Sequence, residues 1–197
     1  MKRILTIIAA VIFSISVMSQ GYEVGDYASD FNLRNVDGKY VSLEDYEDAR
    51  GFIVIFTTNH CPYAVAWEDR IIELDRMFKS KGYPVIAVNP NSAEAYPADS
   101  YEKMIERSRD KGFTFPYLHD AKQEIYKIYG ATKTPHVYVL SKEGETKYKV
   151  EYIGAIDNNY RDAAKADEHY VQDAVKSLLA GSKPDPDFTR AIGCGIK

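Results

Sequence analysis

Cys61 stands at a point in the chain where a reactive thiol is expected. It follows an apolar run, Phe52–Phe56, and directly precedes Pro62 and a stretch with helical periodicity. The first N–H groups of a helix are unpaired and carry partial positive charge, which stabilises a nearby thiol as the reactive thiolate. The segment Cys61-Pro-Tyr-Ala64 also has the form of a Cys-x-x-Cys redox loop with alanine in the second cysteine position. A buried, unreactive cysteine is the alternative interpretation.

Cys194 is the second of the two cysteines in this 197-residue chain. It lies between two glycines, and this composition predicts a flexible, exposed segment. An extended tail starting at Gly181 reaches about 40 Å, so a bond between Cys194 and Cys61 is sterically feasible. Two cysteines are too few for a disulfide scaffold, and their spacing is unlike that of a zinc finger. A structural disulfide, a reactive thiol with its partner, and a bystander cysteine in a tail held by Ile196 all stay open.

Two histidines neighbour these segments. His60 directly precedes Cys61, where an imidazolium would favour the thiolate, but a solvent-facing histidine fits the sequence equally well. If His136 approaches from the other side, then His60, Cys61 and His136 form a soft site for copper or zinc, although without a recognised ligand spacing. Glu68 and Asp69 are expected on a solvated helix face.

The order of apolar patterns predicts an α/β domain. Continuous apolar runs predict buried strands at Phe52–Phe56 and residues 85–89, and the Asp37-Gly38 pair predicts a hairpin turn. The remaining strands are expected at residues 31–33, 40–42, 136–140 and 147–153, and helices are expected at 64–81, 100–111, 122–129 and 163–179. Right-handed crossovers then give a mixed sheet with helices on both faces. Cys61 would lie at the carboxyl end of a central strand, where open α/β sheets place their sites.

Helical spacing also identifies the side chains that should face the core. The expected inward residues are Trp67, Ile71, Leu74 and Phe78 in the first helix, Met104 and Ile105 in the second, and Val171, Ala174, Val175 and Leu178 in the last.

The N-terminal residues have the pattern of a secretory signal peptide. Lys2 and Arg3 precede an apolar run that ends in small residues, with cleavage expected after Ser19; an uncleaved anchor is the alternative. Loss of residues 1–19 removes these two positive charges and no negative charge, so the formal net charge changes from −4 to −6. A negative chain disfavours nucleic acid and anionic membranes as partners. Export would place both cysteines in an oxidising compartment.

Several segments together resemble the thioredoxin-fold redoxins of the alkyl hydroperoxide reductase and thiol-specific antioxidant (AhpC/TSA) family, in its peroxiredoxin-like group. The matching segments are Val24-Gly-Asp26, Asp30-Phe31, Asn59-His-Cys-Pro-Tyr63, Ala66-Trp-Glu-Asp-Arg70, Tyr96-Pro-Ala-Asp-Ser100, Phe115-Pro-Tyr117, Thr134-Pro135, Leu179-Ala-Gly181 and Gly193-Cys-Gly-Ile-Lys197. The resemblance covers about residues 22–197. It implies a thioredoxin-like fold, with a central mixed β-sheet flanked by helices and an N-terminal β-hairpin extension.

The resemblance also implies roles for individual residues. A cis Pro135 at the start of a strand would face Cys61, although base rates favour the trans form. The expected site consists of the catalytic residues Cys61 and Cys194 and the substrate-binding residues Thr58, His60, Thr134 and Pro135. No cofactor and no metal is implied.

Several positions depart from the patterns of thioredoxins and peroxiredoxins, and among them His60 stands where thioredoxins usually carry tryptophan. Ala64 replaces the second cysteine of thioredoxins, and Ile55 replaces their buried acid. Val54 replaces the proline that precedes the threonine and cysteine of peroxiredoxins, and the nearest cation to the facing loop is Lys133. The sequence therefore leaves the substrate open between a disulfide and a peroxide.

These observations predict an exported, periplasmic thiol oxidoreductase with Cys61 as its nucleophile. The expected organisation is a signal peptide at 1–19, a redoxin domain at 22–181 and an extended tail at 182–197. Its partners would be a thiol or disulfide protein or a peroxide, together with an external reductant, without nucleic acid and without stable membrane association after cleavage. The alternative is a non-catalytic binding or metallochaperone-like redoxin that uses His60 and Cys61.

Overall fold

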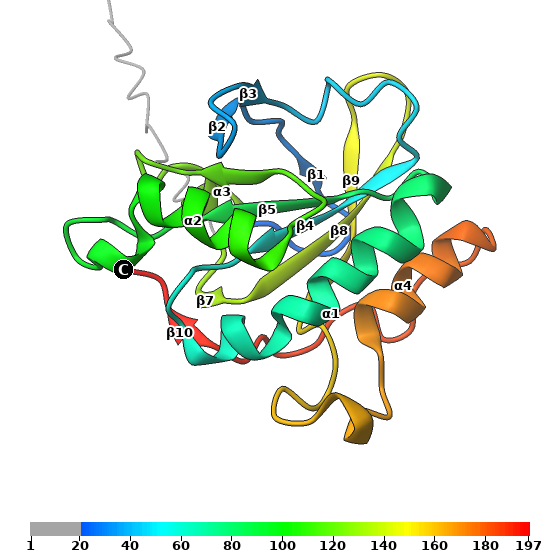
Figure 1. Ribbon diagram of the computed structural model, residues 1–197. Coiled ribbons are helices and arrows are strands. Elements are labelled where there is room, and N and C mark those ends of the chain that lie inside the picture. The colour runs from blue at the N-terminus through cyan, green and yellow to red at the C-terminus, as the bar shows by residue number, and fades with distance from the viewer. Residues whose placement is uncertain (1–20) are drawn as a thin grey trace, which may run out of the picture.

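The computed structural model describes residues 21–197, which form one large sheet with helices packed against it (Figure 1). The expected signal peptide lies outside the described residues. The strands are β1 (Tyr27–Ala28), β2 (Leu33–Asn35), β3 (Tyr40–Val41), β4 (Gly51–Phe56), β5 (Val85–Asn89), β6 (Tyr117–His119), β7 (Lys133–Thr134), β8 (His136–Lys142), β9 (Tyr148–Gly154) and β10 (Cys194–Gly195). The α-helices are α1 (Pro62–Phe78), α2 (Tyr101–Lys111), α3 (Ile125–Tyr129) and α4 (Tyr170–Leu179).

The sheet is mixed, as the sequence predicts. Its eight strands run in the order β1-β9-β8-β4-β5-β6-β2-β3, and β7 and β10 form a separate pair. β4 is parallel to β5 and antiparallel to β8, so it lies at the centre. Every residue of β4 is buried because this apolar strand is covered on both faces. Cys61 follows the carboxyl end of this central strand.

The two faces of the sheet have separate cores. One core contains the inward stripes of α1 and α4 together with Met104 of α2. The other contains Phe52 and Phe56 of β4, the α3 residue Tyr129 and residues of the N-terminal segment. Figure 1 shows α1, α2 and α4 on one side of the sheet. Helices on both faces confirm the predicted architecture.

Most predicted elements are present with small shifts at their ends. β5 has the expected bounds, and Gly38, with φ of 87°, sits in the turn between β2 and β3. The whole expected stripe of α1 is buried. Among residues 21–197, no helix is both long and apolar enough to span a bilayer.

The last helix begins later than predicted. The expected start, Ala163, instead opens a 3₁₀ turn (Ala163–Lys165), because the Asp162 side chain accepts a hydrogen bond from the Ala164 N–H at 3.0 Å. α4 then starts only at Tyr170. The third helix is also shorter than expected, because the Asp120 carboxylate binds backbone N–H groups at its start.

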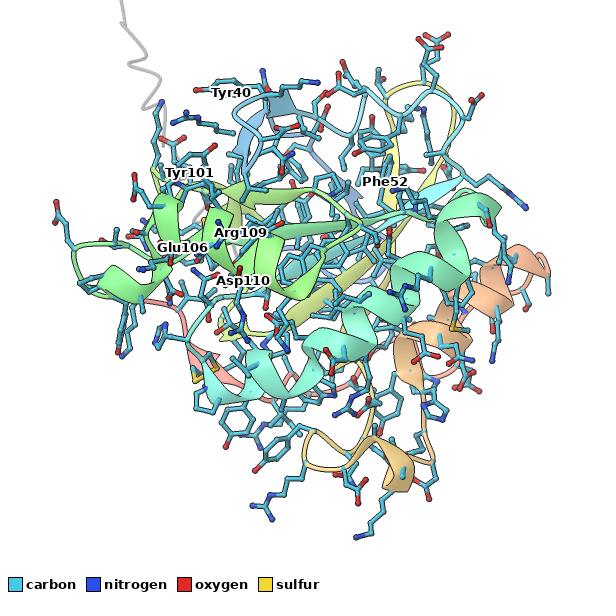
Figure 2. The ribbon with its side chains drawn as sticks, in the orientation of Figure 1. Tyr40, Phe52, Tyr101, Glu106, Arg109 and Asp110 are labelled. Carbon is cyan, nitrogen blue, oxygen red and sulfur yellow. A yellow bond between two sulfur atoms is a disulfide. The ribbon has the colours of Figure 1, made fainter. Side chains whose placement is uncertain are left out.

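The prediction for α2 is wrong in one position. Ser100 caps the helix as expected, accepting from the Lys103 N–H at 3.4 Å, and Met104 is fully buried. Ile105, however, is 39% exposed. It is exposed like Glu106, Arg109 and Asp110 of the same helix, which Figure 2 shows on α2.

Candidate active site

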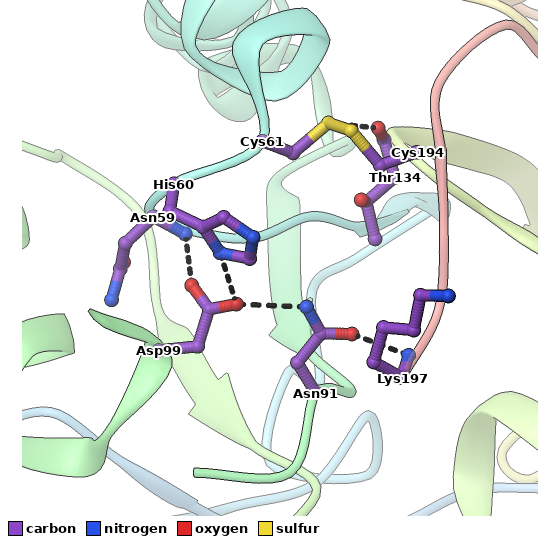
Figure 3. Close-up of a disulfide and its surroundings, with 8 residues drawn as sticks. All are labelled: Asn59, His60, Cys61, Asn91, Asp99, Thr134, Cys194 and Lys197. Carbon is purple, nitrogen blue, oxygen red and sulfur yellow. Dashed lines mark hydrogen bonds and ion pairs between the residues drawn. A yellow bond between two sulfur atoms is a disulfide. The ribbon is translucent and has the colours of Figure 1, made fainter. Parts of the chain in front are cut away.

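Cys61 and Cys194 form a disulfide at the amino end of α1 (Figure 3). The two residues are 133 positions apart in sequence, and their Cα atoms are 6.1 Å apart. Cys61 is fully buried, and its Sγ lies 3.1 Å from the carbonyl oxygen of Thr134. The sequence left three interpretations of the two cysteines open. The structure shows that they are bonded to each other.

The local sequence explains why a helix begins at this cysteine. Cys61 has extended backbone angles and is the N-cap residue, and Pro62 occupies the first turn, where its missing N–H is not needed. The first turn contains no acidic side chain. The partial positive charge of the helix terminus is therefore available to a thiolate on Cys61.

The second loop meets the disulfide from the other side. The Thr134–Pro135 peptide bond is cis, as expected, and Thr134 is fully buried. β7 pairs with β10 in antiparallel fashion, with Cys194 opposite Thr134. A side chain at Gly193 would meet the Thr134 carbonyl oxygen at 2.3 Å, so only glycine allows this close approach.

Residues 193–197, here called the strap, are held by more than the disulfide. The Lys197 N–H donates to Asn91 Oδ1 at 2.9 Å, and the Lys197 carbonyl accepts from the Ser92 N–H at 2.9 Å and from Gln123 Nε2 at 2.6 Å. Ile196 packs against the second core. The strap is thus a docked segment, contrary to the flexible, exposed tail that its composition predicts.

A buried aspartate organises the chain just before Cys61. Asp99 is fully buried and accepts hydrogen bonds from the Asn59 N–H at 2.8 Å, His60 Nδ1 at 2.6 Å and Asn91 Nδ2 at 2.8 Å. The His60 bond places the ring proton on Nδ1, because a carboxylate only accepts. These contacts link His60 to the strap, since Asn91 also binds Lys197 (Figure 3).

Aromatic side chains lie on both sides of the cysteine segment. The His60 ring stacks on Tyr96 with 4.4 Å between centroids. Two residues after Cys61, the Tyr63 ring lies 4.6 Å from the Tyr160 ring. The disulfide therefore sits beside a segment with a ring pair at each end.

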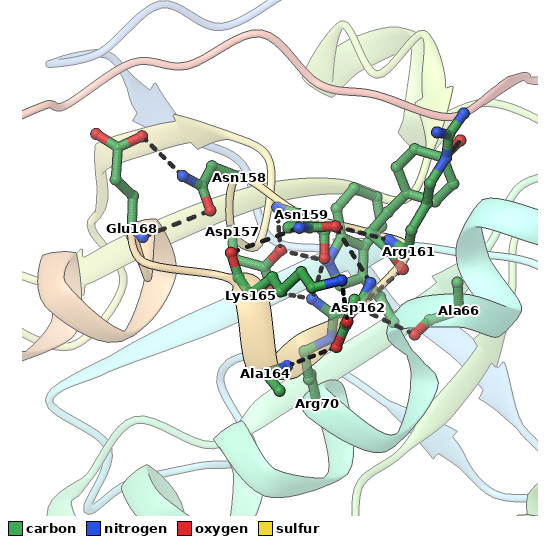
Figure 4. A network of polar contacts seen from close by, with 12 residues as sticks. Ala66, Arg70, Asp157, Asn158, Asn159, Arg161, Asp162, Ala164, Lys165 and Glu168 are labelled. Carbon is green, nitrogen blue, oxygen red and sulfur yellow. Dashed lines mark hydrogen bonds and ion pairs between the residues drawn. The ribbon is translucent and has the colours of Figure 1, made fainter.

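A polar network joins Arg70 of α1 to Asp157 and the residues that follow it (Figure 4). Arg70 of α1 pairs with Asp157, which is 2% exposed, and donates to the carbonyls of Asn159 at 2.7 Å and Tyr160 at 2.9 Å. Trp67 Nε1 also donates to Asp157 at 2.9 Å. Residues 157–168, here called the flank loop, are thereby attached to the first half of α1.

Thr58 and Thr134, the two threonines expected in the site, are both buried. Thr58 is 3% exposed and lies three positions before Cys61. Among residues 21–197, neither the Thr58 nor the Thr134 hydroxyl oxygen has a hydrogen-bond partner. A buried hydroxyl without a partner is costly, so both are candidates for binding a small polar ligand.

His136 does not join the site. Its ring packs 5.0 Å from Tyr138, which belongs to the core on the other face, and its Nδ1 accepts from the Thr132 N–H at 3.3 Å. It lines a cavity of about 600 Å³ together with Phe188. Burial lowers the pKa of His136 to about 4. The soft metal site with His60 and Cys61 therefore lacks its third ligand, and residues 21–197 contain no other cluster of three or more potential ligands.

The expectation for Glu68 is wrong. Glu68 is 5% exposed and forms hydrogen bonds with Arg107 at 2.6 and 2.7 Å and an ion pair with Lys111 at 3.2 Å. The cations of α2 reach across to it, which the pattern of α1 alone does not reveal. Its neighbour Asp69 is exposed, as expected.

The sequence reasoning also missed Asp99, Asn91 and Tyr160 as parts of the site. Asp99 lies within the Tyr96–Ser100 segment that carries the family resemblance, but its role depends on a contact with a residue 39 positions away. Asn91 and Tyr160 lie in loops without a local pattern. No signal in the sequence marks them.

Comparisons with known proteins identify the family. A model described as the AhpC/TSA family matches residues 24–149. The chain belongs to this family. It is 30% identical over 163 residues to the "Thiol-disulfide oxidoreductase ResA" of Oceanobacillus iheyensis, covering 78% of this chain and 80% of the relative.

Solved structures agree with this assignment. An uncharacterized conserved protein from Geobacillus kaustophilus is 32% identical with a TM-score of 0.82, covering 94% of this chain and 97% of that chain. A "thiol:disulfide interchange protein, thioredoxin family protein" from Chlorobium tepidum TLS has a TM-score of 0.55 at 16% identity, with coverage of 72% and 93%, and shows the fold alone. The AhpC/TSA member described here has a thioredoxin-like fold and is an oxidoreductase.

Proposed function

We propose that this protein is a thiol–disulfide oxidoreductase that alternates between a Cys61–Cys194 disulfide and the corresponding dithiol. The observation that carries the proposal is the position of this disulfide, with Cys61 at the amino end of α1 and the Thr134–Pro135 loop against it. A purely structural disulfide needs neither a helix terminus nor a facing loop of this kind.

The reaction proceeds in two sulfur exchanges. In the reduced protein, the Cys61 thiolate attacks one sulfur of a substrate disulfide, and the other substrate sulfur leaves as a thiolate. Cys194 then attacks the Cys61 sulfur, the second substrate thiolate leaves, and the Cys61–Cys194 disulfide forms. Two electrons have passed to the substrate, and an external thiol reductant restores the dithiol. Thr134 and Pro135 shape the groove in which the substrate sulfur approaches.

Peptide mapping after reaction with a model disulfide tests this proposal. Reduced wild type should end with the intramolecular disulfide and release two substrate thiols. Cys194→Ser should stop at a mixed disulfide on Cys61, and Cys61→Ser should be inactive. A protein in which Cys194 reacts first, or in which neither cysteine turns over, contradicts the proposal. The non-catalytic binding alternative predicts no turnover in any variant.

A peroxide is the second candidate substrate, and one observation favours it. Thr58 offers a buried hydroxyl without a partner close in sequence to Cys61. Attack of the thiolate on a peroxide O–O bond gives a Cys61 sulfenic acid and releases an alcohol or water, and Cys194 then displaces water to form the disulfide. Thr58→Val should slow oxidation by peroxide and leave exchange with a disulfide unchanged. If both rates are unchanged, Thr58 does not bind peroxide.

We further propose that the protein is exported to the periplasm and cleaved after Ser19. The support is the pattern of residues 1–19 and the disulfide, which persists in oxidising compartments. Residues 22–181 would then form the redoxin domain and 182–197 the tail. N-terminal sequencing of the protein recovered from a periplasmic fraction should begin at Gln20. Recovery of the uncleaved chain contradicts this.

A further inference from the structure

The two cysteines of the disulfide have different surroundings. Cys61 is at the amino end of α1, where the helix stabilises its thiolate. Cys194 lies in the two-residue strand β10 and belongs to no helix, so its sulfur meets the amino end of α1 only through its bond to Cys61. Before Cys194 attacks the Cys61 sulfur of the mixed disulfide, it must lose its thiol proton. An ordinary thiol is only about 3% ionised at pH 7, so a nearby base would accelerate this step.

The strand beneath the disulfide provides no such base. The residue of β4 that lies six positions before Cys61 is Ile55, which is apolar and fully buried. On the facing loop, Thr134 presents a carbonyl oxygen and a hydroxyl group. A proton acceptor must therefore come from another element.

His60 and Asp99 are placed to fill this need. Figure 3 shows the His60 ring between Asp99 and the Cys61–Cys194 disulfide, with Nδ1 on the Asp99 side. The 2.6 Å bond to Asp99 fixes the proton on Nδ1 and leaves Nε2 as the nitrogen that can accept a proton. The stack on Tyr96 holds the plane of the ring. The His60 side chain is 30% exposed, so solvent can exchange protons with it.

The strap that carries Cys194 is docked on the same network. Asn91 donates to Asp99 at 2.8 Å and accepts from the Lys197 N–H at 2.9 Å. One set of hydrogen bonds thus fixes the orientation of the imidazole and the position of the segment that bears Cys194. Such a shared anchor keeps the two groups in register during repeated opening and closing of the disulfide.

We propose that His60 accepts the thiol proton of Cys194 through Nε2 during disulfide closure, and that Asp99 is the positioning residue that holds the imidazole for this transfer. This inference rests on the proposed function. The Cys194 sulfur forms a bond with the Cys61 sulfur, the bond from Cys61 to the substrate sulfur breaks, and the substrate leaves as a thiolate. The proton passes from Cys194 to His60 and then to solvent. In the reverse direction, the imidazolium returns a proton to the departing Cys194 sulfur.

The closure step can be observed directly with dithiobis-nitrobenzoate, an aromatic disulfide. Reduced protein mixed with one equivalent should release one coloured thiolate as Cys61 is modified and a second as Cys194 closes the disulfide. The rate of the second release reports the proposed proton transfer. We expect His60→Gln to slow it about tenfold at pH 7.

The pH profile separates proton transfer from a structural defect. Above about pH 9, Cys194 ionises without help, so the His60→Gln and wild-type rates should converge. A loosened site would instead give a constant deficit at every pH. The titratable groups in contact with His60 or its neighbour Asn59 are Asp99, Tyr96 and Tyr117, which donates to Asn59 at 2.9 Å, whereas Lys197 joins the network through its backbone N–H. Each of these is retained in the variant.

Two further variants complete the test. Asp99→Asn removes the negative charge and leaves one acceptor oxygen for three donors, so it should reproduce the His60→Gln profile. The double variant should be no slower than either single variant, because Asp99 acts through His60. If Asp99→Asn fails to fold, the partly exposed His60 position still decides the matter. His169→Gln, at an exposed histidine on the α4 side, is the matched control and should retain the wild-type profile.

Parallel pH profiles, an undiminished rate in His60→Gln at pH 7, or additive losses in the double variant would overturn the proposal. Failure of the proposed function gives a different result. In that case the second coloured thiolate is absent even in wild type, or Cys194→Ser still releases both.

Discussion

The strap and the flank loop both lie near the amino end of α1, and each is held by a network around one buried aspartate. The two aspartates, Asp99 and Asp157, differ in their partners. Asp99 on the strap side receives two amide-type donors and a histidine. Asp157 on the loop side receives Arg70, a cation at every physiological pH, and the Trp67 indole. The strap is also covalently bonded to the site, whereas the flank loop is not. The strap side can therefore respond to redox state, whereas the contacts on the loop side are the same in both redox states.

This comparison explains why two aspartates of similar burial should behave differently under substitution. Breaking a permanent ion pair leaves an uncompensated charge in the protein, so stability suffers in every redox state. Loss of the disulfide on the strap side should change stability only in the oxidised protein, where that bond is formed.

The largest effect is expected from Cys194→Ser in the oxidised protein. A disulfide across 133 positions restricts the unfolded chain, and its loss should lower the free energy of unfolding by about 4–5 kcal/mol. Urea denaturation of oxidised wild type and variant measures this difference. Under a strong reductant, the two proteins should unfold at the same urea concentration. A difference that persists after reduction would mean that the serine disturbs the strap independently of the disulfide.

Arg70→Ala should destabilise the protein by about 3–4 kcal/mol, because it leaves the Asp157 carboxylate buried without its cation. The loss should be the same in oxidised and reduced protein, since the flank loop has no covalent link to the strap. Lys103→Ala is the matched control, because it breaks the exposed 2.6 Å pair with Glu106 and should leave the urea midpoint nearly unchanged. A redox-dependent loss in Arg70→Ala would show that the two sides are coupled.

Protonation of His136 should lower the free energy of unfolding in mildly acidic solution. Its pKa is about 4 in the folded protein, because of burial, and about 6.5 when unfolded, so the unfolded state binds the proton more readily. The contribution of neutral His136 to the free energy of unfolding is fully present above pH 6.5. It decreases by up to about 3 kcal/mol as the pH falls from 6.5 to 4. His136→Gln should remove this component, as seen in the difference between the two urea profiles at pH 7.5 and 5. Identical slopes for both proteins would contradict it.

The sequence predicts the fold well where an element depends only on residues that are neighbours in the chain. The apolar strand at Phe52–Phe56, the proline after Cys61 and the stripe of α1 need only neighbouring residues, and they place Cys61 at a helix terminus. The pairing of Cys61 with Cys194 stayed one of several alternatives, because nothing near Cys194 specifies where the tail docks. The anchors of the strap, such as Asn91, are defined only in three dimensions.

The two histidines show the same limit within the site. His60 and His136 each adjoin a loop that meets the disulfide, so the sequence allowed both to approach Cys61. The alternation of side chains along β8 turns His136 to the opposite core, beside Tyr138. His60 acquires its carboxylate partner from a segment 39 positions away. Similar sequence positions therefore give one histidine in the site and one outside it.

The smallest effect concerns the aromatic pair on the loop side. Tyr160 lies 4.6 Å from Tyr63, and this pair borders the segment that contains Cys61. A substrate with an aromatic residue next to its disulfide should gain about 0.5–1.5 kcal/mol from contact with these rings. Tyr160→Ala should therefore raise KM about threefold to tenfold for a peptide disulfide with a neighbouring tryptophan, with little change in kcat.

Tyr160→Phe separates the ring from its hydroxyl group. The phenyl ring retains the contact with Tyr63, so this variant should retain the wild-type KM. A matched peptide with serine in place of tryptophan should bind wild type and Tyr160→Ala equally, because it has no ring to lose. If Tyr160→Ala affects both peptides alike, the flank loop supports the site mechanically and does not select the substrate. A loss confined to the tryptophan peptide would mean that substrate selection depends on the flank loop, which Asp157 holds in place, whereas proton transfer would depend on His60, which Asp99 holds in place.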